Sequence, residues 1–126
     1  MHSKKILKLS LIVIAIIAVL SFVIPKISSI PVNNRDSARV EDITKIGQAL
    51  EYYYEDKGEY PESLEVLADP NQPYTASLPV DPQGNDYIYQ PSPAGGPYNK
   101  YTLYAVLENP SKSNSSGNKY LLKSAR

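Results

Sequence analysis

The stretch RDSARVEDITKIGQALEYYYEDKG, residues 35–58, predicts the element around which the rest of the chain folds. Apolar or small side chains recur at the spacing of one α-helical face, at Val40, Ile43, Gly47, Leu50 and Tyr54. Gly58 then supplies a usual helix stop. Because only one face of this helix is apolar, the helix must pack against another element, and we expect the residues of that face to lie in a core.

The partner of the helix follows in the sequence. Three segments are rich in Tyr, Ile, Leu and Val, are bounded by turn residues and are predicted strands: 86–90, 100–107 and 119–123. Leu103 and Leu107 share the face of the middle strand that we expect to lie on the helix. Residues 61–68 predict a short helix that begins with proline. The predicted fold class is α+β, with a long N-terminal helix packed on a small antiparallel sheet of about three strands.

An apolar run without ionisable side chains, residues 9–25, precedes the amphipathic helix. As a helix it spans about 25 Å, near the short limit for the hydrocarbon core of a bilayer. Lysines flank the run, mostly on its N-terminal side, at Lys4, Lys5, Lys8 and Lys26. This asymmetry predicts a single-pass protein of the cell membrane, with a cytoplasmic N-terminus and an extracytoplasmic head. A cleaved signal peptide is the alternative, which the length of the run and the missing Ala-x-Ala site disfavour.

The sequence therefore divides into four predicted segments. They are a basic cytoplasmic tail at 1–8, a transmembrane or shaft helix at 9–25, a kinked linker at 26–34 and an extracytoplasmic head at 35–126. Pro25 and Pro31 favour a break between the two helical stretches, and Asn33 or Asn34 can cap the restarted helix.

Small residues mark one side of the apolar run. Ala15, Ala18 and Ser21 are spaced by three and nearly share a helix face. Helices in lipid associate through close packing or polar contacts, because the lipid is as apolar as the helices. We expect a neighbouring shaft to pack on this face, and the open alternative is that these are ordinary small residues facing lipid.

Composition excludes several classes of function. Lys and Arg number 13, Asp and Glu number 13, and no basic tract stands out, so we expect no nucleic-acid partner. The absence of cysteine excludes disulfides, zinc–thiolate sites and a cysteine nucleophile. His2 is the only histidine and lies in the predicted tail, so the head cannot form a His-dependent triad. We expect no enzymatic activity, no metal site and no cofactor.

Three segments resemble the superfamily of type IV pilins and type II secretion pseudopilins: VIAIIAVLSFVIP at 13–25, RDSARVEDITKIGQALEYYYEDKGEYPESL at 35–64 and LPVDPQGNDYIYQ at 78–90. The resemblance implies a pilin-like fold and a structural subunit of a type IV pilus or a type II secretion-type envelope filament. Its implied partners are the lipid bilayer, other pilin-like subunits and the proteins that assemble pilus or secretion systems.

The sequence departs from that superfamily at three positions that matter for assembly. No glycine precedes Gly47, so the usual prepilin cleavage motif is missing, and Leu9 stands where the shaft glutamate is usual. The last loop, 108–118, has one carboxylate, Glu108, whereas calcium prefers several, so we expect little effect of calcium. The missing cleavage motif and the missing glutamate by themselves favour the alternative given below, whereas the resemblance over most of the chain favours a filament subunit, and we expect a minor or atypical one. The alternative is an uncleaved, membrane-anchored binding module with a pilin-like head.

Overall fold

The computed structural model describes residues 31–125 of the 126-residue chain. Contacts divide the chain into two units, Met1–Asn33 and Asn34–Arg126, and the fold below is that of the second unit. The predicted tail, the apolar run and most of the linker lie outside the described residues, and so do Lys4, Lys5, Lys8, Lys26, Ala15, Ala18 and Ser21. Within residues 31–125, no helix is long and apolar enough to cross a membrane.

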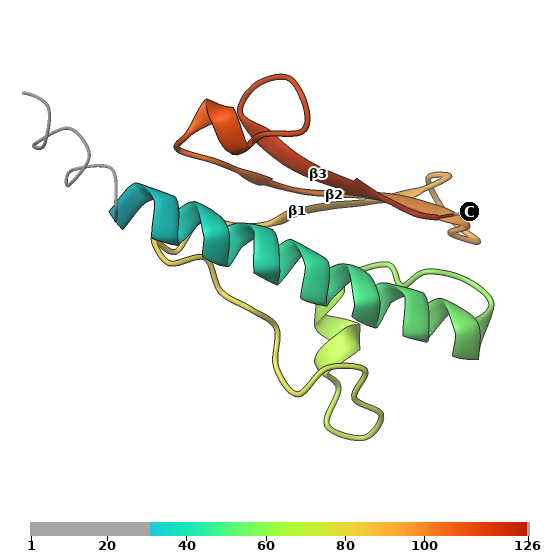
Figure 1. The fold of residues 1–126 in the computed structure, drawn as a ribbon. Coiled ribbons are helices and arrows are strands. Elements are labelled where there is room, and N and C mark those ends of the chain that lie inside the picture. Colours follow the sequence, from blue (N-terminus) through green and yellow to red (C-terminus); the bar gives the residue numbers. More distant parts are fainter. Residues whose placement is uncertain (1–30, 126) are drawn as a thin grey trace, which may run out of the picture. The chain divides into compact units, whose positions relative to one another are not determined.

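A long helix occupies residues 31–57 (Figure 1). It begins earlier than predicted, so Asn33 and Asn34 lie within the helix, and the prediction that one of them caps it is wrong. Pro31, the first residue that the structure describes, is already helical. Gly58 ends the helix as predicted, with a φ of 79° and an N–H that donates to the Tyr54 carbonyl at 2.8 Å.

The three predicted strands form one antiparallel sheet. Their bounds are β1 (Ile88–Ser92), β2 (Lys100–Val106) and β3 (Lys119–Lys123), and their spatial order is β1-β2-β3. The long helix packs along one face of this sheet, which confirms the α+β class (Figure 1). The 3₁₀ helix η1 (Leu64–Ala68) lies beside the long helix, and η2 (Pro110–Lys112) lies in the connection from β2 to β3 (Figure 1).

Strand β1 begins and ends later than the predicted 86–90. Asp81 accepts hydrogen bonds from both the backbone and the side-chain amide of Asn85, so the turn that precedes β1 extends as far as Asn85. Pro91 is accommodated because β1 is an edge strand. Pro91 lies opposite Tyr101 of β2. The carbonyl of Tyr101 accepts a hydrogen bond from the N–H of Ser124, on the β3 side of β2, so it needs no backbone donor from Pro91.

The predicted short helix is shorter than 61–68 and is a 3₁₀ helix. The carbonyl of Pro61 accepts a hydrogen bond from the hydroxyl of Tyr89, 2.7 Å away, instead of one from a following helical N–H. The N–H of Tyr60 donates to the carbonyl of Tyr98 at 2.7 Å. Contacts with β1 and with the loop after it thus keep this segment out of a helix until Leu64.

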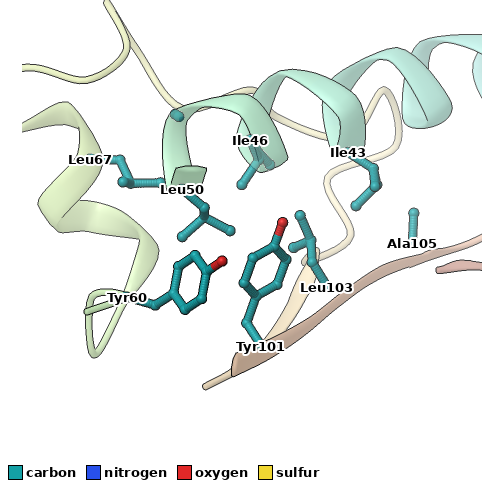
Figure 2. Close-up of a cluster of buried hydrophobic side chains, with 9 residues drawn as sticks. Ile43, Ile46, Leu50, Tyr60, Leu67, Tyr101, Leu103 and Ala105 are labelled. Atoms are coloured by element: carbon teal, nitrogen blue, oxygen red, sulfur yellow. The ribbon is translucent and has the colours of Figure 1, made fainter. Parts of the chain in front are cut away.

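The core lies between the helix, β2 and η1 (Figure 2). Its members are at most 3% exposed, and they are Ile43, Ile46, Ala49, Leu50, Tyr60, Leu67, Tyr101, Leu103 and Ala105. Alternate residues of β2 face the helix, as the period of a strand requires. Figure 2 shows Ile43, Ile46 and Leu50 pointing from the helix into this cluster. The helix is therefore the layer to which both the sheet and η1 are attached.

Candidate functional site

The start of the long helix carries two charged side chains into the protein interior. Asp36 and Arg39 lie one turn apart on the face that continues into Ile43, and their exposed fractions are 0% and 1%. Arg39 Nη1 donates to Asp36 Oδ1 at 2.7 Å. A side chain remains charged in the protein interior only where other polar groups replace its hydrogen bonds to water. The groups around Arg39 therefore make up the site.

The guanidinium of Arg39 is fully hydrogen-bonded. It has one N–H at Nε and two at each terminal nitrogen. Nε and Nη2 donate to the two oxygens of Asp81, the second at 3.3 Å. Nη2 also donates to Gln83 Oε1 at 2.7 Å, and Nη1 also donates to Glu108 Oε1 at 2.8 Å. Hydrogen bonds from the side chain, above all to Asp81, raise the pKa of Arg39 above its ordinary value.

The two buried carboxylates also hold the backbone of two loops. Asp36 accepts the N–H groups of Glu108 at 3.0 Å and Asn109 at 2.8 Å. Asp81 accepts the N–H of Gln83 at 2.7 Å. Burial by itself would raise the pKa of Asp81, but the hydrogen bonds from Arg39 and from backbone N–H groups outweigh it and lower that pKa. The carboxylate charge is therefore stabilised in the folded protein.

Glu108 joins this cluster at its solvent-facing side. Arg35 Nε and Nη2 donate to its two oxygens at 2.7 and 2.6 Å, a bidentate pair whose side chains are 28% and 30% exposed. Hydrogen bonds from Arg35 first and Arg39 second lower the pKa of Glu108 to about 2. We call Arg35, Asp36, Arg39, Asp81 and Glu108 the charge cluster.

The charge cluster connects three segments that are distant in sequence. Asp36 and Arg39 belong to the helix, Asp81 to the turn before β1, and Glu108 to the loop after β2. Within the described chain, every buried side-chain nitrogen and oxygen has a hydrogen-bond partner. Every carboxylate of the cluster faces a guanidinium, so the arrangement suits positioning of loops rather than proton transfer or nucleophilic chemistry.

Residues 31–125 contain no group of three or more His, Cys, Asp or Glu side chains arranged to hold a metal ion. The carboxylate of the last loop, Glu108, is engaged by two guanidinium groups. Asp81 lies in a turn, which the N–H of Gly84 closes on the Asp81 carbonyl at 2.9 Å. A cation at Glu108 would have to displace Arg35 and Arg39.

A second polar group lies further along the helix, where tyrosines gather. The hydroxyl of Tyr60 donates to Glu51 at 3.0 Å, and that of Tyr101 lies 3.4 Å from the same carboxylate. The rings of Tyr60 and Tyr101 pack edge to face with centroids 4.8 Å apart. Burial raises the pKa of Tyr101, and the nearby charge of Glu51 adds to the effect. These tyrosines fill the core and leave their hydroxyls at a polar partner.

The structure places the residues of the predicted head core as follows. Buried residues are Ile43, Gly47, Leu50, Leu103 and Leu107. Val40 and Tyr54 are partly buried, and the ring of Tyr54 lies 4.6 Å from that of Tyr60. Gly47 permits close packing, because a Cβ at this position would overlap the side chain of Leu122.

The charge cluster was not predicted from the sequence. A signal was present, because Arg39 precedes Ile43 by four residues and therefore lies on the apolar face. A charged residue on the buried face of a helix predicts a buried partner of opposite charge. The identity of that partner, Asp81, depends on a contact across 42 positions of sequence.

Comparison with known proteins places this head in a family. A family model described as type II secretion system (T2SS), protein G, matches residues 32–118, from the helix to the end of the last loop. The chain is 33% identical over 110 residues to the type II secretion system core protein G of Pseudomonas aeruginosa, with 75% of this chain and 78% of the relative covered. No solved structure matches the chain. The chain belongs to the family of type II secretion system protein G.

Proposed function

We propose that this protein is a pseudopilin-like structural subunit of a type II secretion-type envelope filament. The observation that carries the proposal is the family match over residues 32–118, which covers the helix from residue 32 onward, strands β1 and β2, and the loop up to the start of β3. In this function the apolar run holds the subunit in the bilayer and packs against other shafts. The head then presents its exposed loops outside the membrane to neighbouring subunits or to assembly proteins.

The flanking sequence supports the membrane part of the proposal. The run at residues 9–25 has no ionisable side chain, and Lys4, Lys5 and Lys8 precede it. The missing Gly before the run and Leu9 in place of the usual glutamate favour a minor or atypical subunit over a bulk one. A subunit of this kind retains its N-terminus and remains integral to the membrane.

Intact mass measured on protein from native membranes tests the retained N-terminus. We expect the full-length mass after carbonate extraction. A soluble protein that lacks roughly its first twenty to thirty residues, the usual length of a signal peptide, would contradict the proposed anchor.

Crosslinking within the membrane tests the assembly. Ala18 lies between Ala15 and Ser21 on the predicted packing face, so Ala18→Leu should weaken crosslinks between copies, or to secretion-system proteins, while insertion is unchanged. Ile16→Leu keeps a large side chain on a different face and should crosslink like the wild type. If the wild type gives no crosslink of either kind, the filament proposal fails and the anchored binding module becomes the better account.

A further inference from the structure

The outer edge of β3 exposes backbone groups to which another strand could bind. β3 is an edge strand, and the carbonyl of Asn118 and the N–H of Ser124 bond toward β2. Backbone groups alternate in direction along a strand of an antiparallel pair. The residues whose N–H and C=O groups point outward are therefore Lys119, Leu121 and Lys123. Such an edge is a template for strand addition unless the protein covers it.

The β2–β3 loop covers this edge with one side chain. The N–H of Leu121 donates to Asn114 Oδ1 at 2.7 Å, and Asn114 Nδ2 donates to the Leu121 carbonyl at 2.9 Å. The backbone N–H of Asn114 donates to the carbonyl of Lys119 at 3.2 Å. A primary amide carries an acceptor and a donor side by side. The Asn114 side chain therefore reproduces the pair of bonds that one residue of a partner strand would make.

The loop that carries Asn114 is fixed at both ends. The N–H of Leu107 donates to the Asn118 carbonyl at 2.7 Å, which closes the loop on itself. The N–H of Asn109 donates to Asp36 at 2.8 Å, which attaches the loop to the charge cluster. The position of Asn114 is thus set by the fold of the head and not only by its bonds to Leu121.

We propose that Asn114 is a latch that prevents β3 of a second copy from adding to β3. The second copy is the fitting occupant because the outward N–H and C=O of Leu121 match themselves about a two-fold axis. In such an antiparallel pair, Leu121 of each copy exchanges both hydrogen bonds with its equivalent, and Lys119 lies opposite Lys123. The latch keeps the sheet at three strands. This inference is independent of the proposed function.

Hydrogen exchange of the full chain in detergent tests the latch. Asn114→Ala should accelerate exchange of the Leu121 amide roughly tenfold, as expected for the loss of about one hydrogen bond. The amide of Leu122, which faces β2, should be unchanged. Ser116→Ala, an exposed change in the same loop, should leave both amides at wild-type rates. Equal Leu121 exchange in the wild type and in Asn114→Ala would overturn the latch.

Disulfide trapping tests the pairing that the latch prevents. The chain lacks cysteine, so copies with Lys119→Cys and copies with Lys123→Cys give no background when they are mixed. A mixed disulfide should form when both copies carry Asn114→Ala, and should not form with Asn114 present. Copies that all carry Lys119→Cys should not crosslink to one another. Fast Leu121 exchange without the mixed disulfide would overturn the role against strand addition.

If Asn114→Ala also accelerates exchange at Leu122, the change has loosened the whole sheet, and Asn114→Asp replaces it. A carboxylate retains the acceptor for the Leu121 N–H and loses the donor. Slow Leu121 exchange in Asn114→Asp supports the latch, whereas exchange as fast as in Asn114→Ala overturns it.

Discussion

Arg39 carries a positive charge into a position where 1% of its side chain is exposed. Removing a charge from water costs several kcal/mol, and the cost is offset only when opposite charges and hydrogen bonds surround it. Asp36, Asp81, Glu108 and Gln83 provide both, and they come from three segments of the chain. The guanidinium therefore fixes the turn before β1 and the loop after β2 against the helix.

Arg39→Met removes the positive charge and keeps an unbranched side chain of similar reach. We expect the free energy of unfolding to fall by about 3–5 kcal/mol, because Asp36 and Asp81 remain buried without their partner. Urea denaturation followed by circular dichroism measures this change. Arg35→Met, at the solvent-facing side of the cluster, should have a much smaller effect. A loss below about 0.5 kcal/mol for Arg39→Met would show that the cluster does not stabilise the head.

Stability should decline with acid in a defined window. The folded-state pKa of Glu108 is lowered from 4.5 to about 2, so folding favours its ionised form. Its contribution is complete above about pH 4.5 and is lost as the pH falls through about 2. The lowered pKa of Asp81 acts in the same direction.

Thermal melts of Glu108→Gln measure the share of this decline that Glu108 causes. The variant should be less stable than the wild type near neutral pH, and the difference should narrow between about pH 4.5 and pH 2. Glu55→Gln, on the exposed face of the helix, serves as the control and should follow the wild-type curve. A constant difference at all pH values would contradict the assigned pKa of Glu108.

The long helix is the element on which the other layers depend. Its buried face contacts β2 and η1 through the core, and Gly47 brings its backbone close to Leu122 of β3. Glycine lowers intrinsic helix stability. Its presence at the middle of a buried face is explained by the approach of the sheet and not by local helix preference.

Gly47→Val tests this packing. We expect the free energy of unfolding to fall by about 1–3 kcal/mol, the usual cost of overpacking, because the new side chain overlaps Leu122. Gln48→Val introduces the same residue at the next, exposed position and should change stability by less than about 0.5 kcal/mol. Similar losses for the two variants would indicate that helix preference, and not contact with β3, determines the effect.

The whole molecule consists of two units, with the boundary between Asn33 and Asn34. The second unit contains the core, the sheet and the charge cluster. The helix face and the sheet face cover each other within that unit, so we expect it to be stable without the first 33 residues.

A fragment of residues 34–126 should therefore fold by itself. The fragment should show a cooperative thermal transition. Absence of a cooperative transition would refute independent folding.

Calcium should change the stability of this fragment little, because Glu108 is already bound by Arg35 and Arg39. Thermal melts with EDTA and with millimolar calcium should nearly coincide. A large rise of the transition temperature with calcium would refute this expectation, and Asp81→Asn would then identify whether that carboxylate contributes.

Local patterns in the sequence determined the elements of this protein. The 3.6-residue period of the helix, the stop at Gly58 and the strand at 119–123 follow from side chains that are neighbours along the chain. The α+β class followed as well, since one apolar helix face and three strands can bury their surfaces only against each other.

Tertiary structure alone decided the contacts that join distant segments. The sequence indicated that Arg39 lies on the buried face, but only the fold brings Asp81 and Glu108 to it. The same is true of Asn114, whose bonds to Leu121 depend on the path of a whole loop. Each of these polar contacts needs a specific distance between groups far apart in sequence, and residue spacing determines such distances only within a helix or a strand.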